Sequence, residues 1–155
     1  MGQAGFRLFN DGIAARKIPV RIVAMAIAAE QKTILLVDDD PGILRSVSAL
    51  LADDNYNVLT SSSGRDALQQ SKEYEREIHL LLSDFQMPEL SGVDLATQMT
   101  LERPELKVLL MSGFTERRLV IDAGWHFLAK PFISSQLSAL VVGLVGQGTT
   151  SQRAQ

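Results

Sequence analysis

The sequence predicts an α/β protein in which a doubly wound, parallel five-stranded sheet is covered by helices on both faces. Between residues 32 and 146, five short apolar runs alternate with five stretches that have helical spacing. The first, third and fourth runs are almost continuously apolar, as in strands that are buried on both faces. The length of 155 residues suits one domain, and 46% hydrophobic and 21% charged residues are typical of a globular chain.

The first half of this block is expected to contain two strands and two helices. A strand over 33–37 ends in a run of three acids. Asp40 can cap a helix whose first residue is Pro41, because a carboxylate suits the cap position and proline suits the first turn. A second strand is expected over 56–60 and a second helix over 64–74.

The second half continues the alternation. A third strand is expected over 78–83, stopped by Asp84, and a third helix over 93–102, closed by Pro104. The remaining elements are a strand over 107–111, a short helix over 115–123, a strand over 125–129 and a helix over 134–145.

The two ends of the chain differ from this block. Residues 1–31 show no sustained apolar period and place basic side chains beside the apolar run 22–29. They are expected to be an extension outside the core or the product of an early start codon, with Met25 the true first residue; a weak signal peptide is the alternative. Residues 147–155 are rich in glycine, amide and hydroxyl groups, which predicts a disordered tail. The predicted domain therefore covers 32–146.

Composition excludes several classes of protein. The chain has no cysteine, which rules out disulfide scaffolds, thiolate metal sites and cysteine nucleophiles. Its two histidines, His79 and His126, cannot make a three-histidine metal site and are expected to be ordinary strand residues. The net charge of −3 argues against a nucleic-acid surface, and no apolar run approaches the roughly 20 residues of a membrane helix. We therefore expect a cytoplasmic protein that binds neither nucleic acid nor membrane.

Chemically active side chains follow the strands of the predicted sheet. Asp38 and Asp39 come after the first strand, Asp84 after the third, Ser112 after the fourth and Lys130 after the fifth. In parallel sheets, ligands bind outside the carboxyl ends of the strands. Carboxylate oxygens suit Mg²⁺, and a carboxylate beside that ion can attack phosphorus. The ammonium and hydroxyl groups can then stabilise the transferred phosphoryl group.

Four sequence segments together resemble the receiver domain of two-component response regulators, over about 32–146. They are Val-Asp-Asp-Asp at 37–40, Ser-Asp-Phe-Gln-Met-Pro-Glu-Leu-Ser-Gly at 83–92, Met-Ser-Gly at 111–113 and Phe-Leu-Ala-Lys-Pro-Phe at 127–132. The resemblance implies a flavodoxin-like (βα)5 fold with strand order 2-1-3-4-5. It also implies a phosphoprotein that accepts a phosphoryl group from a histidine kinase or a histidine phosphotransfer protein. Such a domain is not a turnover enzyme, because it catalyses only its own phosphorylation and dephosphorylation.

The resemblance also implies which residues carry the phosphoryl chemistry. Asp84 corresponds to the phospho-acceptor, which also faces the metal ion. Asp39 corresponds to the acid that binds Mg²⁺ directly, and Asp38 to the acid that acts through water. The backbone carbonyl of Gln86 corresponds to the third protein ligand.

Three further residues match the family's switch. Lys130 corresponds to the lysine that pairs with the acceptor and then with its phosphoryl group, and the Lys130–Pro131 bond to one that is usually cis. Ser112 corresponds to the switch hydroxyl. Phe127 corresponds to the aromatic that turns inward when that hydroxyl moves, although a phenylalanine in a strand can also be a plain core residue.

One spacing departs from the family pattern. Ser112 and Lys130 are 18 positions apart, about one helical turn less than usual, so the fourth helix, over 115–123, is expected to be short. That helix, the strand over 125–129 and the last helix form the face through which the family transmits its state. The output surface is therefore expected to differ from the usual one, and homodimerisation through it is an open alternative.

The expected output is contact with an unidentified downstream protein. Only ten residues follow Val145, too few for an output domain. The chain is thus expected to be a single-domain regulator, a phosphate relay or a sink that drains a kinase. The segment Leu-Met-Ser-Gly-Phe-Thr at 110–115 also resembles the corresponding segment of receivers that are attached to hybrid sensor kinases.

Two other functions fit part of the pattern. A phosphatase of the haloacid dehalogenase type needs an Asp-x-Asp after the first strand, which Asp38 and Asp40 supply, but also a second acidic pair late in the chain, which is missing. Turnover of para-nitrophenyl phosphate that Asp38→Asn abolishes would favour it. A scaffold that is no longer phosphorylated is the other alternative, and the short fourth helix is the feature that favours it.

Overall fold

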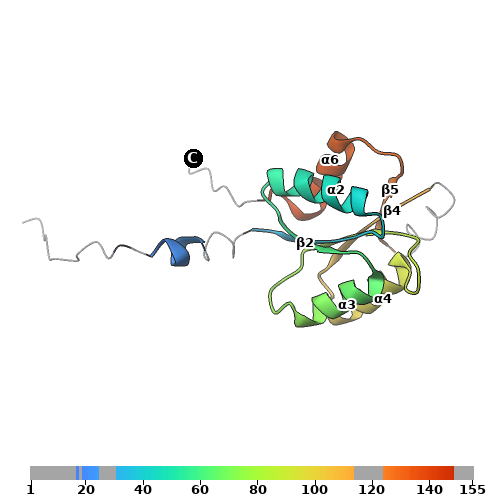
Figure 1. The fold of residues 1–155 in the computed structure, drawn as a ribbon, viewed down its shortest axis with the longest axis horizontal. Helices are drawn as coiled ribbons and strands as arrows, with labels where there is room; N and C mark the ends of the chain where they lie inside the picture. The colour runs from blue at the N-terminus through green and yellow to red at the C-terminus, as the bar shows by residue number, and fades with distance from the viewer. Residues whose placement is uncertain (1–16, 18, 25–30, 114–123, 149–155) are drawn as a thin grey trace, which may run out of the picture.

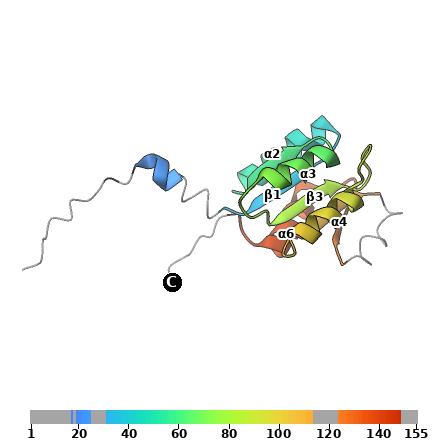
Figure 2. The ribbon, with the colours of Figure 1, turned by 90° about the horizontal axis from the view of Figure 1, so that it is seen from below.

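Five strands form one parallel sheet with helices on both faces in the computed structural model, which describes residues 17, 19–24, 31–113 and 124–148 (Figures 1 and 2). The strand order is β2-β1-β3-β4-β5. Both the predicted fold class and the predicted strand order are therefore confirmed. The elements are β1 (Thr33–Val37), α2 (Pro41–Asp53), β2 (Asn57–Ser61), α3 (Gly64–Glu73), β3 (Leu80–Asp84), α4 (Gly92–Glu102), β4 (Lys107–Ser112), β5 (His126–Ala129) and α6 (Ser134–Val145).

The observed bounds follow the expected ones closely. β1 and α6 have the predicted residues, while β3 begins at Leu80 rather than Ile78 and includes Asp84 as its last residue. The predicted short helix over 115–123 lies outside the described residues, and so do most of the predicted N-terminal extension and residues 149–155 of the predicted tail.

The sheet divides the core into two layers. Helices α2 and α6 cover one face, and α3 and α4 cover the other (Figure 1). β1 lies in the interior of the sheet between β2 and β3, and all five of its residues are buried. Its side chains alternate between the layers: Leu35 and Val37 pack in one, Ile34 and Leu36 in the other. Burial on both faces explains why this strand is continuously apolar.

Polar caps begin three of the helices at the edge where the strands end. Gly42 N donates to Asp40 Oδ1 at 2.7 Å, so Asp40 caps α2 as predicted. Ser63 caps α3 and Ser91 caps α4. In each case the serine hydroxyl oxygen accepts the backbone N–H of the third residue of the helix. These caps fix where each strand-to-helix connection ends, and they hold those connections over the carboxyl edge of the sheet.

The described residues beyond the predicted domain are few. In the N-terminal segment, Val20, Ile22 and Val23 are exposed. At the other end, Gly148 is buried against Asp54 and Asn55, and its carbonyl accepts the backbone N–H of Lys32 at 3.3 Å. None of the helices in the described ranges combines the length and the apolar character that crossing a membrane requires.

Candidate functional site

Three carboxylates meet where β1 and β3 end. The register pairs Val37 of β1 with Ser83 of β3, so the next residue of each strand, Asp38 and Asp84, lies at the same edge. Asp38, Asp39 and Asp84 each offer a carboxylate oxygen within 4.8 Å of the others. The predicted acidic cluster therefore forms, because neighbouring parallel strands end at the same level.

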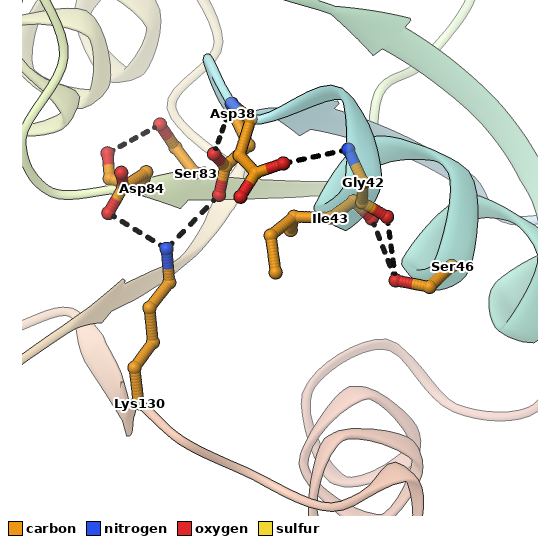
Figure 3. Close-up of polar contacts among 8 residues, drawn as sticks. Asp38, Gly42, Ile43, Ser46, Ser83, Asp84 and Lys130 are labelled. Carbon is orange, nitrogen blue, oxygen red and sulfur yellow. Dashed lines mark hydrogen bonds and ion pairs between the residues drawn. The ribbon is translucent and has the colours of Figure 1, made fainter.

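Lys130 connects two of these carboxylates. Its Nζ lies 3.2 Å from Asp38 Oδ2 and 3.3 Å from Asp84 Oδ1. Figure 3 shows the ammonium between the two carboxylates. The backbone brings it there, since β5 pairs with β4 up to Ala129 and the N–H of Lys130 donates to the Ser112 carbonyl at 2.9 Å. The side chains of the predicted acceptor, one predicted metal-binding acid and the predicted lysine thus share one site.

Asp38 is held from both of its carboxylate oxygens. One oxygen accepts the backbone N–H of Asp40 at 2.9 Å, and the other binds Lys130. The Asp38 side chain is 1% exposed, so both contacts compensate for the loss of water. The residue that caps α2 therefore also orients Asp38, a second role that the sequence pattern did not predict.

Burial and charge shift two pKa values at this site. Burial raises the pKa of Asp84 above its usual range; Lys130 opposes this shift, and Asp38 and Asp39 add to it. Burial by itself lowers the pKa of Lys130, but the Asp38 and Asp84 carboxylates outweigh it and the pKa ends above its usual value. Lys130 is consequently a cation throughout the physiological pH range.

The predicted switch residues lie next to this cluster. Ser112 is the last residue of β4 and is buried, and β4 follows β3 in the sheet. Phe127 of β5 is half-buried and packs against the layer of α3 and α4, opposite Leu110 of β4. Gln86 is exposed in the connection after β3.

A close contact that the sequence did not predict holds the connection after β3. Gly92 begins α4, its N–H donates to the Phe85 carbonyl at 2.9 Å, and a Cβ atom there would overlap the Asp84 carbonyl. The helix thus begins directly against the backbone of the predicted acceptor. The signal that the sequence offers for this contact is a glycine immediately after a serine that can cap a helix.

Comparison with known protein families decides what this arrangement is. The family model described as the response regulator receiver domain matches residues 34–142, most of the chain and the whole of the site. The chain belongs to this family.

Relatives of this receiver domain include two proteins of Brucella. It is 34% identical to the sensor kinase CckA of Brucella abortus over 113 residues, which are 70% of this chain and 12% of that protein. It is 28% identical to the cell cycle response regulator CtrA of Brucella ovis over 117 residues, 72% of this chain and 49% of that protein. The chain thus spans half or less of the length of these curated relatives.

Solved structures agree with the receiver fold. The receiver domain protein of Clostridium thermocellum superposes with a TM-score of 0.69 at 29% identity, covering 74% of this chain and 94% of that one. The chemotaxis response regulator CheY4 of Vibrio cholerae superposes with a TM-score of 0.66 at 26% identity, covering 74% and 98%. The cis peptide bond that the family resemblance predicted between Lys130 and Pro131 is present in this receiver.

The donor set of this receiver fits a hard divalent cation. Three carboxylates and one ammonium leave an excess of negative charge at one edge of the sheet. Mg²⁺ prefers oxygen ligands and is usually held by one or two carboxylates together with water and phosphate oxygens. Asp38, Asp39 and Asp84 provide such oxygens without a thiolate or an imidazole among the described residues within reach.

Proposed function

We propose that Asp84 accepts a phosphoryl group from a histidine kinase or a histidine phosphotransfer protein. The observation that carries the proposal is the position of Lys130 between the Asp84 and Asp38 carboxylates, 3.3 and 3.2 Å away. In the transfer, an Asp84 oxygen bonds to phosphorus while the phosphorus–nitrogen bond of the donor breaks, and the imidazole nitrogen keeps the electron pair. Lys130 is placed to bind the oxygens of the new phosphoryl group.

The site residues support a magnesium ion as cofactor. Asp39 and Asp84 are proposed as direct carboxylate ligands, Asp38 as a ligand through water, and the Gln86 carbonyl as the remaining protein ligand. When bound, Mg²⁺ neutralises phosphoryl oxygens and so reduces their repulsion of the attacking carboxylate. Asp38 is held by hydrogen bonds from Lys130 and from the Asp40 N–H. A carboxylate fixed in this way suits the proposed role of binding the metal ion through water.

Phosphorylation is proposed to switch the receiver between two states. The phosphoryl group adds negative charge and strong acceptor oxygens beside Lys130 and the Ser112 hydroxyl. Shifting a two-state equilibrium from 1:99 to 99:1 takes about 5.5 kcal/mol, and two or three charge-assisted hydrogen bonds of about 1.5–3 kcal/mol each can provide it. Phe127, half-buried beside Leu110, is the proposed mobile aromatic. A protein partner would recognise the phosphorylated state of the receiver. The proposed location is the cytoplasm, where kinases meet ATP.

The function is tested by the intact mass of the protein after incubation with Mg²⁺ and a small acyl phosphate. The wild type is expected to gain one phosphoryl group, and Asp84→Asn none. Asp66→Asn is the matched control, because Asp66 is an exposed aspartate on α3, and it should gain the group like the wild type. Equal gain in the wild type and Asp84→Asn would place the chemistry elsewhere, and no gain in any variant would favour the scaffold alternative.

A further inference from the structure

Helix α2 carries two opposite charges along its exposed side. Arg45, Ala49 and Asp53 recur every four residues and are all exposed, so they form one stripe along the helix. Arg45 and Asp53 are about 12 Å apart along the axis. Neither side chain makes an ion pair within the ranges that the structure describes.

The stability of α2 itself does not explain this stripe. Asp53 is the last residue of the helix, where an anion faces the negative end of the helix dipole. The Asp40 carboxylate caps the other end of α2, but the last turn contains no basic residue, so the helix dipole is uncompensated at its negative end. The position of Asp53 is therefore unfavourable in an isolated helix, and a partner that brings a cation to it would compensate for this.

The surface beside the stripe has the composition of an interface. A groove of about 510 Å³ separates α2 from the connection between β5 and α6, and Ile43, Val47, Leu50 and Phe132 contribute its apolar lining. Helix α6, next to α2 on the same face (Figure 1), has no Asp, Glu, Lys or Arg, although six of its twelve residues are exposed. Depletion of charge is typical of the buried centre of a protein–protein interface.

We propose that a second copy of this chain packs on the face formed by α2, with the two α2 helices antiparallel and crossing at Ala49. Arg45 then faces Asp53 of the second copy, and Asp53 faces Arg45 of the second copy. A two-fold axis uses the same patch on both partners, so one stripe with opposite charges at its ends is complementary to itself. The small Ala49 side chain at the crossing lets the two helices approach closely.

Charge reversal tests this pairing directly in the full chain, without any phosphodonor. Arg45→Glu turns both intermolecular pairs into carboxylate pairs, and Asp53→Arg turns both into guanidinium pairs. Each single variant is expected to raise the dissociation constant of the dimer at least about ten-fold, because like charges across an interface are strongly unfavourable. The double variant Arg45→Glu/Asp53→Arg is expected to return to within about three-fold of the wild type, since it restores two opposite-charge pairs.

Sedimentation equilibrium over a range of protein concentrations measures the dissociation constant, and circular dichroism verifies that each variant is folded. Arg65→Glu is the matched control, since Arg65 is an exposed arginine on α3, in the opposite layer, and reversing it should leave the dimer unchanged. A wild type that is monomeric at every concentration overturns the proposal and leaves this face to another protein. A dimer that the two single reversals do not weaken, or that the double variant does not recover, overturns it as well.

Discussion

At the scale of single residues, the site depends on the balance of charge around Lys130. Its ammonium is the described cation that contacts both Asp38 and Asp84, and Asp38 is almost completely buried. A buried carboxylate without a counter-charge is strongly destabilising, because neither water nor a cation compensates it. Lys130 therefore contributes to stability as well as to the proposed chemistry.

Lys130→Met is expected to lower the free energy of unfolding by about 2–3 kcal/mol, at the low end for a broken buried pair because the lysine side chain is 30% exposed. Adding Asp38→Asn should recover part of this loss, since the amide carries no charge to bury. Chemical denaturation measures both effects, with Lys72→Met, an exposed lysine on α3, as the control. Equal stability of Lys130→Met and the wild type would contradict this account of the site.

Gly92 and Gly143 allow a matched test of backbone packing at two helical glycines. A methyl group at Gly92 would overlap the Asp84 carbonyl, so Gly92→Ala should destabilise the protein by about 1–3 kcal/mol and slow the proposed phosphorylation. A Cβ atom at Gly143, within α6, meets nothing within 4 Å. Gly143→Ala should therefore stabilise the protein by about 0.5–1 kcal/mol through helix propensity.

Thermal or chemical denaturation gives the sign of each change, and the mass experiment gives the rate of phosphorylation. The two alanine substitutions are expected to have opposite signs. If both stabilise the protein, the connection after β3 adapts easily and Gly92 does not fix the position of Asp84.

At the scale of elements, one arginine fastens α3 to α4. Arg103, the C-terminal cap of α4, donates through its guanidinium to the backbone carbonyls of Ser71, Tyr74 and Arg76 and to the Ser71 hydroxyl. The last carbonyls of a helix have no partner within it, and a cation there also opposes the negative end of the dipole. The contact therefore stabilises the end of α3 and sets the distance between the two helices.

Arg103→Met is expected to destabilise the protein by about 2–3 kcal/mol, because several hydrogen bonds to one charged group are lost together. Arg103→Lys should lose nearly as much, since one ammonium cannot reproduce the planar fork of donors. Arg65→Met on the exposed side of α3 is the control and should change stability little. Hydrogen exchange of the amides in the last turn of α3 distinguishes local fraying from global loss.

At the scale of the whole molecule, the two edges of the sheet differ in chemistry. The acidic cluster lies where the strands end, whereas a hydrogen-bonded network around His79, which also contacts the Glu77 carboxylate at 3.3 Å, lies where they begin. There, His79 Nδ1 accepts the backbone N–H of Thr33 at 3.0 Å, and the Tyr74 hydroxyl accepts from the Asn57 amide at 3.1 Å. A nitrogen that accepts a hydrogen bond cannot carry a proton, so this edge favours the neutral imidazole.

Stability is expected to fall with acidification through His79. Burial lowers the pKa of His79 from its ordinary value of 6.5, against the raising effect of Glu77. Below about pH 6.5 the unfolded chain therefore binds a proton that the folded chain does not, and the contribution of His79 to stability, present at neutral pH, is progressively lost.

The measurement is the free energy of unfolding between about pH 5 and pH 7, before most carboxylates titrate. His79→Gln should flatten the dependence in this range, because glutamine does not titrate. His126→Gln, at an exposed position of β5, is the control and should keep the slope of the wild type. The same slope in both variants would assign the effect to other groups.

The sequence by itself determined the order of strands and helices along the described chain and which charged side chains gather at one edge of the sheet. Continuous apolar runs such as β1 can only be buried on both faces, and Asp38, Asp84 and Lys130 follow strands directly, so the topology of a parallel sheet brings them to one edge. These signals are local or follow from a general rule of the fold. The roles of the individual site residues, from the proposed acceptor Asp84 to Ser112, Phe127 and Gln86, came from the family resemblance and stay predictions.

Only the tertiary structure decided which groups touch. The Asp40 N–H on Asp38, the Asp84 carbonyl against Gly92 and the guanidinium of Arg103 on α3 are contacts that no local pattern encodes. Arg103 reaches carbonyls 27 to 32 residues away in the chain, and its partners depend on how α3 packs beside α4. Periodicity assigns a residue to a face of an element, but the position of one element on another follows from the packing of all their side chains together.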